Sequence, residues 1–240
     1  MKILVTGGAS GLGLAIVQQL AQNQQDFIYF TYSKSSKAAL QTEQKLSNTK
    51  AIYCDFTNED SIQSLLKEIP ILDLDVLVNN AYHGAYLKTY FHKTSCDDFT
   101  LDYQQNLLPV IKITQTAILH FRKKKSGKII TILTSLLADV PPAGTAVYAA
   151  NKAYLKQLTK VWATENIKFN ISSNAISPGF MQTSLTSETD ERIIEQMTVE
   201  HPLKKLLSTN EVADAVNFLV HTTNQINGID LLINSGINMR

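Results

Sequence analysis

Cysteine is scarce in this sequence, which limits the kinds of site that the chain can form. Only two cysteines occur among 240 residues, Cys54 and Cys96, and they lie far apart and without the spacing of metal ligands. A disulfide-stabilised fold is therefore not expected, and neither is a metal site. We expect both side chains to be ordinary core or loop thiols.

An excess of charge and a long apolar run at the N-terminus are lacking too. The formal net charge is +1, from 22 Lys and Arg against 21 Asp and Glu, which gives no general reason to expect nucleic acid or an anionic membrane as a partner. Residues 3–5 are apolar, but glycine follows at position 7. This run is too short for a signal-peptide core or a membrane-spanning helix, so we expect a cytoplasmic protein.

Internal repeats and low-complexity linkers are absent as well. What the chain does have is 44% hydrophobic and 18% charged residues, the balance of a globular protein with a sizeable core. A length of 240 residues suits one large α/β domain. We therefore expect a single domain over residues 1–240.

The first strong pattern is a glycine-rich turn between a strand and a helix. Residues 2–6 are almost wholly apolar, as expected of a strand in a parallel sheet, and residues 14–20 have helical spacing. Gly7, Gly11 and Gly13 lie between them and would let backbone N–H groups approach a pyrophosphate at the positive end of the helix. The pattern favours nucleotide binding, and the alternative is a tight structural turn.

Residues 27–32 are expected to form the second strand, whose end meets the adenosine ribose in a dinucleotide-binding fold. An acidic residue there would bind the 2′-hydroxyl of NAD, but this sequence has Ser33 and Lys34 and no carboxylate before Glu43. A cation and hydroxyls suit a 2′-phosphate, so NADP(H) is favoured over NAD(H). The alternative is a solvated turn that contains a lysine.

The third and fourth strands are expected at residues 50–54 and 74–78. Asp55 follows the third strand and could accept a hydrogen bond from an adenine amino group, or could cap the next helix. Asn80, Ala81 and Tyr82 follow the fourth strand.

Tyr148 and Lys152 lie four positions apart in a helix-prone run, and therefore on one helix face. A lysine ammonium held there favours the tyrosinate and lowers a phenol pKa that is otherwise near ~10, which makes the tyrosine a usable general acid or base. Tyr148 is the only one of nine tyrosines with a lysine at this spacing. The alternative is a solvated helix face.

A hydroxyl group is expected beside this pair. Residues 128–133 read as the fifth strand and are followed by Thr134 and Ser135. Ligands of open α/β sheets bind outside the carboxyl ends of the strands, so either hydroxyl could face the site. Residues 100–122 carry a long helical pattern that contains Asn106.

The last third of the chain is expected to supply the remaining wall of the site. Residues 167–176 are predicted as the sixth strand, and the turn after it, at Pro178 and Gly179, leaves backbone free to meet the nicotinamide end of a cofactor. Residues 184–205 are predicted to form a mobile lid over the substrate, with a plain surface helix as the alternative. The final strand is expected at residues 229–234.

In combination, these residues resemble the pattern of the short-chain dehydrogenase/reductase family, most of all its 3-oxoacyl-acyl-carrier-protein reductase branch. The matching residues occur in order along most of the chain: Gly7, Gly11, Gly13, Asn80, Asn106, Ser135, Tyr148 and Lys152. The resemblance implies an α/β fold with a single Rossmann-like domain, in which a doubly wound parallel sheet carries helices on both faces.

The resemblance also implies four catalytic residues. Ser135, which the family spacing selects over Thr134, would donate a hydrogen bond to the substrate carbonyl, and Tyr148 would protonate it. Lys152 would lower the pKa of Tyr148 and hold the nicotinamide ribose. Asn106 would bend its helix and bind a water of the proton relay.

NADP(H) is the cofactor that the resemblance implies, with an adenine contact from Asp55, a carboxamide contact from the amide near Met181 and another from Thr183. The residues expected to bind the cofactor are Thr6, Gly7, Ser10, Gly11, Leu12, Gly13, Ser33, Lys34, Asp55, Phe56, Asn80, Ala81, Tyr148, Lys152, Pro178, Gly179, Met181 and Thr183.

The sequence departs from the family pattern in two places. Tyr82 stands where most members have glycine, so it either flanks the substrate mouth or reshapes the turn. Ser235 stands where the branch more often begins an Asp-Gly-Gly run, which bears on C-terminal packing and assembly. The basic residues 122–125 correspond to a patch that docks an acidic carrier protein in the resembled reductases, and a solvated helix end is the alternative.

The sequence thus predicts an NADPH-dependent ketoreductase acting on a β-ketoacyl thioester, bound to acyl-carrier protein or coenzyme A, with the hydroxyacyl product. One alternative is a short-chain reductase of another small-molecule substrate: a free ketone or alcohol, a sugar, a steroid-like compound or a pteridine. Another is a non-catalytic NADP(H)-binding regulator. A homodimer or homotetramer that pairs the long helices is expected.

Overall fold

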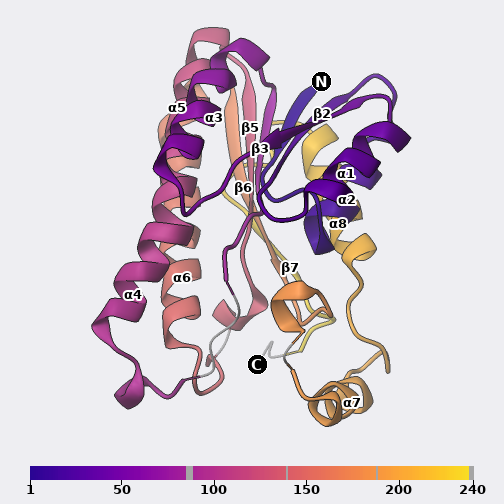
Figure 1. Ribbon diagram of the computed structural model, residues 1–240, viewed down its shortest axis with the longest axis vertical. Helices are drawn as coiled ribbons and strands as arrows, with labels where there is room; N and C mark the ends of the chain where they lie inside the picture. Colours follow the sequence, from indigo (N-terminus) through magenta and orange to yellow (C-terminus); the bar gives the residue numbers. More distant parts are fainter. Residues whose placement is uncertain (85–88, 139, 188, 238–240) are drawn as a thin grey trace.

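A computed structural model of the chain describes residues 1–84, 89–138, 140–187 and 189–237. In this part of the chain, seven parallel strands form one sheet in the order β3-β2-β1-β4-β5-β6-β7 (Figure 1). The strand order reverses between β1 and β4, where open α/β sheets bind their ligands. The strands are β1 Lys2–Val5, β2 Phe27–Tyr32, β3 Thr49–Tyr53, β4 Val76–Asn79, β5 Gly127–Ile132, β6 Ile171–Pro178 and β7 Asp230–Ile233.

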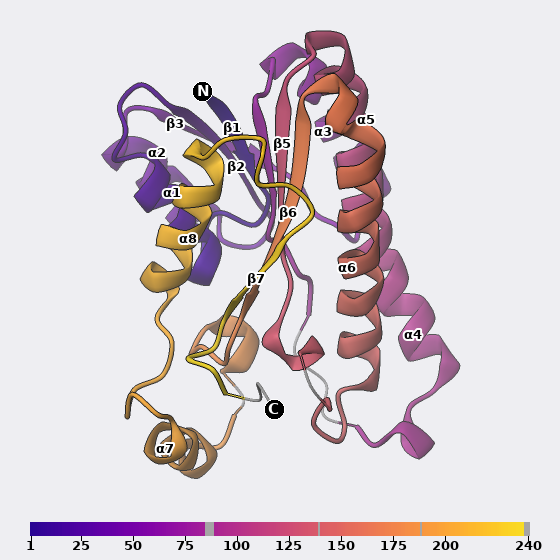
Figure 2. The same ribbon diagram turned by 180° about the vertical axis from the view of Figure 1, so that it is seen from behind.

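Helices cover both faces of the sheet, which confirms the predicted fold class. In Figures 1 and 2, α1, α2 and α8 lie on one side, and α3, α4, α5 and α6 lie on the other. The helices are α1 Gly11–Leu20, α2 Ser36–Lys45, α3 Glu59–Leu72, α4 Cys96–Asp102, α5 Leu108–Lys124, α6 Ala146–Asn166, α7 Glu191–Glu200 and α8 Thr209–His221. None of the helices in the described ranges is long and apolar enough to cross a membrane.

The core consists of two hydrophobic clusters separated by the sheet. One joins Val17 of α1 and Val216 of α8 to the strands, and the other joins Ile113 of α5 and Trp162 of α6 to the opposite sheet face. The central strands contribute to both clusters because their side chains alternate between the two faces. Fully burying one large aliphatic or aromatic side chain contributes about 1.5–3 kcal/mol, so these clusters hold the carboxyl ends of the strands in place.

The long helix predicted over residues 100–122 is interrupted. The helical run starts earlier, at Cys96, where Ser95 and Asp98 form a reciprocal capping box. A π-helical turn, Tyr103–Leu107, then separates α4 from α5. Pro109 near the start of α5 lacks an N–H group, so the regular hydrogen-bond ladder cannot pass through this point.

The sixth strand begins later than the sequence predicted. Residues 167–169 form a single 3₁₀ turn after α6, and β6 then runs to Pro178. Asn170 separates the two with a left-handed backbone (φ 58°), a conformation that asparagine tolerates better than most residues. The apolar Ile167 and Phe169 gave this segment a strand-like pattern.

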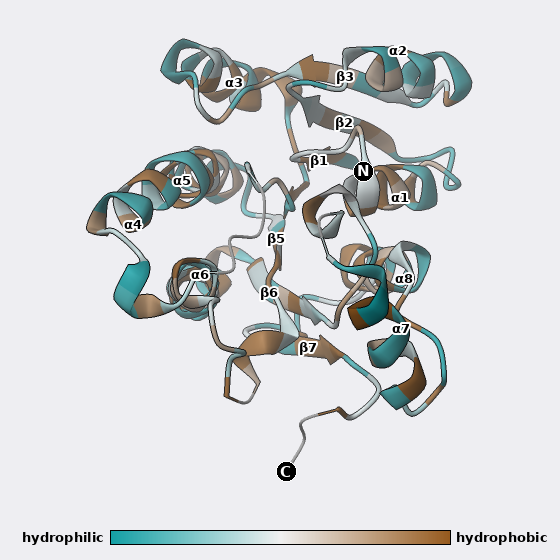
Figure 3. Cartoon of the chain, turned by 60° about the horizontal axis from the view of Figure 1, so that its bottom comes forward, coloured by the Kyte–Doolittle hydropathy of each residue, from teal (hydrophilic) through white to brown (hydrophobic). Residues whose placement is uncertain are grey.

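The carboxyl edge of the sheet, at the bottom of Figure 1, is where the loops after β1, β2, β4, β5 and β6 come together. Helix α7 stands beyond this edge and carries both hydrophobic and hydrophilic residues (Figure 3). The strand order and the position of α7 therefore indicate that the functional site lies at this end of the molecule.

Candidate active site

A cavity of about 850 Å³ opens at this carboxyl edge. It contains most of the residues that the sequence predicted for the site: Gly7, Ser10, Gly11, Leu12, Gly13, Ser33, Lys34, Phe56, Asn80, Ala81, Ser135, Tyr148, Lys152, Pro178, Gly179, Met181 and Thr183. Thr6, Asp55 and Asn106 do not line it. The structure thus brings together residues from both ends and the middle of the chain.

The glycine turn leaves room for a ligand where side chains would fill the space. Gly7 has a φ of +69° and Gly11 a φ of +51°, values that favour glycine. A Cβ on Gly13 would stand 2.0 Å from the Gly7 carbonyl oxygen, so the start of α1 can approach the turn only without one. Backbone N–H groups at a helix start suit a pyrophosphate, and this cradle fits the predicted dinucleotide.

Thr6 lies behind the turn rather than in the cavity. Its buried hydroxyl accepts hydrogen bonds from the N–H groups of Asn80 and Ala81, both at 3.0 Å. The Asn80 amide nitrogen donates to the carbonyl oxygens of Thr6, at 2.9 Å, and Gly7, at 3.2 Å. These bonds tie the loop after β1 to the loop after β4, and so fix the glycine turn against the site.

Ser33 and Lys34, which follow β2, line the part of the cavity that is predicted to hold the adenosine. Asp55 instead accepts hydrogen bonds at one carboxylate oxygen from the Thr57 N–H, at 2.9 Å, and from the Thr57 hydroxyl, at 2.8 Å. The first of these bonds is the main cause that lowers the pKa of Asp55. Asp55 does not cap the next helix, because Asn58 is the N-cap of α3 and accepts from the Ser61 N–H. The contact of Asp55 with adenine stays a prediction.

Lys152 and Tyr148 project from α6 into the same part of the cavity. The Lys152 ammonium is buried, donates to the Ile132 carbonyl oxygen at 3.0 Å and lies 5.8 Å from the centre of the Tyr148 ring. Burial lowers the pKa of Lys152 to about 8, and the negative charge of Asp102 opposes this shift. The Lys152 side chain therefore gains or loses its proton near pH 8.

Ser135 and Thr134 both line the cavity, at the end of β5. The Thr134 hydroxyl accepts a hydrogen bond from the Leu136 N–H at 3.3 Å and so caps the short turn that follows. Ser135 begins that turn. The geometry is compatible with the family spacing, which selects Ser135 over its neighbour.

Asn106 is buried in the π-helical turn and faces the loop after β4. Its side-chain oxygen accepts from the His83 N–H at 2.5 Å, and its amide nitrogen donates to the His83 carbonyl at 3.1 Å and to Asp102 at 2.9 Å. The side chain therefore fixes the loop that carries Tyr82. Asn106 lies in the π-helical turn that separates α4 from α5. Its predicted roles, to bend the helix and to bind the relay water, stay predictions.

Asp102 was not assigned a role from the sequence, and Tyr82, which was expected to flank the substrate mouth or to reshape the turn, lines the cavity. Tyr82 donates a hydrogen bond from its hydroxyl to Asp102 at 2.7 Å and packs edge-to-face against Tyr148, with ring centres 5.3 Å apart. The spacing of Asp102 and Asn106, four positions on one helix, was a signal that could have singled out the aspartate. The role of Tyr82 required the fold.

The turn after β6 forms the part of the cavity that is predicted to hold the nicotinamide. The Gly179 N–H donates to the Ile233 carbonyl at 2.7 Å, which anchors the turn to β7. Met181 and Thr183 line the cavity beyond it, and the Thr183 N–H donates to the Thr186 hydroxyl at 3.0 Å. A carboxamide would meet backbone and hydroxyl groups here.

Part of the predicted lid also reaches the cavity. Ile193 and Met197, four positions apart on α7, face it with apolar side chains, and α7 begins at Glu191 with an Asp190 cap. Residue 188, within the predicted lid of residues 184–205, lies outside the described residues. Helix α7 therefore turns apolar side chains towards the cavity, and its role as a mobile lid stays a prediction.

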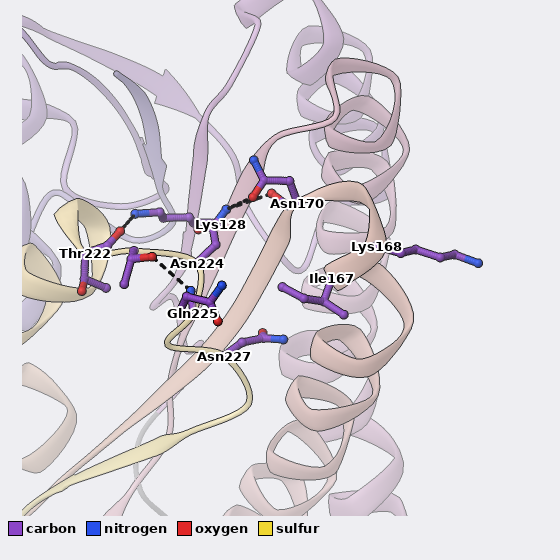
Figure 4. A pocket seen from close by; sticks show the side chains of 9 residues that line it. Lys128, Ile167, Lys168, Asn170, Thr222, Asn224, Gln225 and Asn227 are labelled. Atoms are coloured by element: carbon purple, nitrogen blue, oxygen red, sulfur yellow. Dashed lines mark hydrogen bonds between the residues drawn. The ribbon is translucent and has the colours of Figure 1, made fainter.

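A second cavity, of about 730 Å³, lies at the opposite edge of the sheet (Figure 4). Lys128 on its wall donates to the carbonyl oxygens of Val220, at 2.7 Å, and Thr222, and these lie at the C-terminal end of α8. Lysine here satisfies the last carbonyls of a helix. Because Lys128 is engaged in these hydrogen bonds, we assign no ligand to this second cavity.

The two cysteines are ordinary thiols, as expected. Cys54 is buried, and burial raises the pKa of its thiol to about 11, which makes it unreactive. Cys96 is exposed at the start of α4. Within the described ranges, no three His, Cys, Asp or Glu side chains are grouped to hold a metal ion.

Comparison with known proteins gives the family. The family described as enoyl-(acyl carrier protein) reductase matches residues 7–238. The 3-oxoacyl-[acyl-carrier-protein] reductase FabG of Thermotoga maritima is 30% identical over 236 residues, which are 95% of each chain. L-fucose dehydrogenase of Mus musculus is 32% identical over 245 residues, covering 98% of this chain and 87% of that protein.

Solved structures agree with this match. A short chain dehydrogenase from Burkholderia cenocepacia J2315, in complex with NADP, has a TM-score of 0.85 to this chain at 27% identity, covering 98% of this chain and 97% of its own. The chain belongs to the short-chain dehydrogenase/reductase family.

Membership of this family makes the protein an oxidoreductase, which confirms the class of enzyme predicted from the sequence. The family uses NAD(P)H, so the predicted class of cofactor is confirmed as well. The similar proteins include a carrier-protein reductase and a sugar dehydrogenase, so similarity alone does not select the substrate.

Proposed function

We propose that the protein is an NADPH-dependent ketoreductase that acts on β-ketoacyl thioesters. The observation that carries this proposal is the meeting of Ser135, Tyr148 and a buried Lys152 in the cavity that also contains the glycine turn. These side chains supply a hydrogen-bond donor, a proton donor and a cation beside a dinucleotide cradle. That combination suits the reduction of a carbonyl group.

Bound NADPH would supply a hydride to the carbonyl carbon. Ser135 would donate a hydrogen bond to the carbonyl oxygen, whose negative charge grows during the reaction. Tyr148 would then give its phenolic proton to that oxygen. The Lys152 ammonium would stabilise the tyrosinate that remains, and the Ile132 carbonyl holds this ammonium in position. Asn106 would anchor the relay water that restores the proton.

The preference for the phosphorylated cofactor is supported by Ser33 and Lys34, which line the cavity after β2. A cation and a hydroxyl would neutralise and hydrogen-bond a 2′-phosphate. Fluorescence titration of the protein with NADPH and NADH tests this preference. We expect Lys34→Glu to weaken NADPH binding by roughly tenfold or more and to leave NADH binding nearly unchanged. Equal affinity of the unaltered protein for NADPH and NADH would contradict the proposed preference for NADPH.

The thioester substrate is supported by the similarity to the Thermotoga reductase and by the apolar residues Ile193 and Met197 that face the cavity from α7. We propose that residues 184–205 close over the acyl chain. A second candidate, reduction or oxidation of a free sugar, is favoured by the similarity to L-fucose dehydrogenase. Ratios of kcat/KM for acetoacetyl-CoA, L-fucose and small ketones separate the two. A higher ratio for the sugar would overturn the thioester proposal.

Docking of a carrier protein on residues 122–125 would depend on two of the four cations. Arg122 donates to the Asn166 side chain at 2.7 Å, and Lys124 pairs with Asp75 at 2.6 Å, so both are engaged within the chain. We therefore expect the joint replacement of Lys123 and Lys125 by alanine to raise KM for a carrier-bound substrate. The same variant should leave KM for acetoacetyl-CoA unchanged. If the variant and the unaltered enzyme have the same KM for the carrier-bound substrate, the carrier protein does not dock on these residues.

We also propose that the chain forms a homodimer or homotetramer through its long helices. Large apolar side chains are exposed on the helical layer formed by α4, α5 and α6: Leu101 is 52%, Leu119 59% and Tyr154 49% exposed. Exposed apolar side chains on these helices support pairing through this layer. Light scattering after size exclusion tests this proposal, and a monomer at micromolar concentration would contradict it.

A further inference from the structure

Asp102, at the end of α4, connects three parts of the candidate active site. One carboxylate oxygen accepts hydrogen bonds from the Tyr82 hydroxyl, at 2.7 Å, and the Asn106 amide, at 2.9 Å. The other accepts from the Asn151 amide at 2.6 Å. The three donors come from the loop after β4, the π-helical turn and α6, so a single carboxylate holds these segments together.

Tyr82 stands between this carboxylate and the catalytic candidates. Its ring meets the Tyr148 ring edge-to-face, with centres 5.3 Å apart, and the Lys152 nitrogen lies 5.4 Å from the centre of the Tyr82 ring. An ammonium near an aromatic ring is stabilised by the ring's quadrupole. Burial raises the pKa of Tyr82 far above its ordinary value, so its hydroxyl keeps its proton and remains a donor to Asp102.

The charge of Asp102 also acts on Lys152. The titratable groups that face Lys152 in the described residues are Tyr82, Asp102 and, from its own helix, Tyr148. Of these, Asp102 is the carboxylate, and its charge favours the ammonium form of Lys152 against the effect of burial. Without that charge, Lys152 would lose its proton at a lower pH.

We propose that Asp102 and Tyr82 are positioning residues for the catalytic pair, in which Asp102 holds the Tyr82 ring against Tyr148 and beside the Lys152 ammonium. This inference rests on the proposed function, in which Tyr148 and Lys152 carry the chemistry. It explains how the site accommodates tyrosine where most family members have glycine: the large ring is tied back to α4 and packs against the catalytic pair.

The first test compares Asp102→Asn with the unaltered enzyme in ketone reduction over a range of pH. The proton donor Tyr148 needs the Lys152 ammonium, so activity should fall as pH rises through the pKa of Lys152. In Asp102→Asn this alkaline limb should move to lower pH by at least about half a unit. The control Asp214→Asn, at an exposed position of α8, should leave the limb in place.

The second test reads Lys152 directly and does not need a substrate. The ¹³C chemical shift of the Lys152 ε-carbon, identified by its loss in Lys152→Met, should titrate at a lower pH in Asp102→Asn than in the unaltered protein. This result stands even if the protein reduces no ketone, so it separates a failure of this inference from a failure of the proposed function. An unchanged titration in a folded Asp102→Asn variant would overturn the electrostatic role.

Tyr82→Phe tests the hydrogen bond and covers the case in which Asp102→Asn does not fold. It keeps the ring but removes the bond to Asp102, so kcat should fall by roughly threefold to tenfold while KM and the Kd for NADPH stay within about twofold. Tyr154→Phe, on the exposed side of α6, is the matched control and should leave kcat, KM and the Kd for NADPH unchanged. An unchanged kcat in Tyr82→Phe would overturn the positioning role.

Discussion

At the scale of single residues, the candidate active site is built around one buried cation. Lys152 is 5% exposed, and its ammonium donates to a backbone carbonyl rather than to a carboxylate. A buried charge without an ion-pair partner is costly, and its pKa shifts to reduce the cost. In the proposed reaction, this arrangement would leave the ammonium available to the negative charge that forms on the Tyr148 oxygen.

The pH dependence of stability follows from the same lysine. Its pKa is about 8 in the folded protein against 10.5 in the reference state, so the folded state releases this proton first. The cost of burying the ammonium is fully present below about pH 8 and is relieved as the pH rises towards 10.5, by about 3 kcal/mol.

Lys152→Met removes this titration and isolates it from all other groups. The free energy of unfolding of the unaltered protein, relative to the variant, should therefore rise between about pH 7 and about pH 10. Urea unfolding of both proteins at the two pH values measures it. A difference in stability that does not change with pH would contradict the buried ammonium.

At the scale of elements, the end of α5 is fixed to the sheet by an aromatic ring over a glycine. Phe121 is fully buried, and a Cβ on Gly127 at the start of β5 would stand 2.3 Å from the Phe121 ring. The ring therefore occupies the space that a side chain on the strand would need. This contact sets how closely α5 lies against the sheet, and with it the place of Asn106 at the other end of the helix run.

Phe121→Ala should consequently destabilise the protein by about 3–5 kcal/mol, because it leaves a cavity between α5 and the sheet. Phe218 on α8 is 52% exposed and offers the matched control. Phe218→Ala should cost less than about 1 kcal/mol. Chemical denaturation of both variants measures the two values, and similar losses of stability would show that Phe121 does not anchor the helix.

The elements also show where local patterns mislead. Ile167 and Phe169 read as strand residues, but α6 runs on to Asn166 and the left-handed Asn170 reverses the chain before β6 begins. A backbone conformation of this kind is set by the packing of helix against strand. It left no mark in the alternation of apolar residues, so the start of β6 could not be placed from the sequence.

At the scale of the whole molecule, the fold and the core of the candidate site follow from local patterns. Tyr148 and Lys152 share a helix face, and the glycine turn lies between its strand and helix, so spacing along the chain predicted both. Asp102 is different, because its partners Tyr82 and Asn151 are 20 and 49 positions away. Only the folded chain shows that these three side chains meet.

In the proposed reaction, the Tyr148 phenol, beside the Lys152 ammonium, protonates the substrate carbonyl. The most direct test of this step is the single-turnover rate of NADPH oxidation by Tyr148→Phe with acetoacetyl-CoA, together with the Kd for NADPH. We expect the rate to fall by at least about a thousandfold while the Kd stays within about twofold, because the ring remains and only the proton donor is lost. A Tyr148→Phe variant that keeps the rate of the unaltered enzyme would contradict the account.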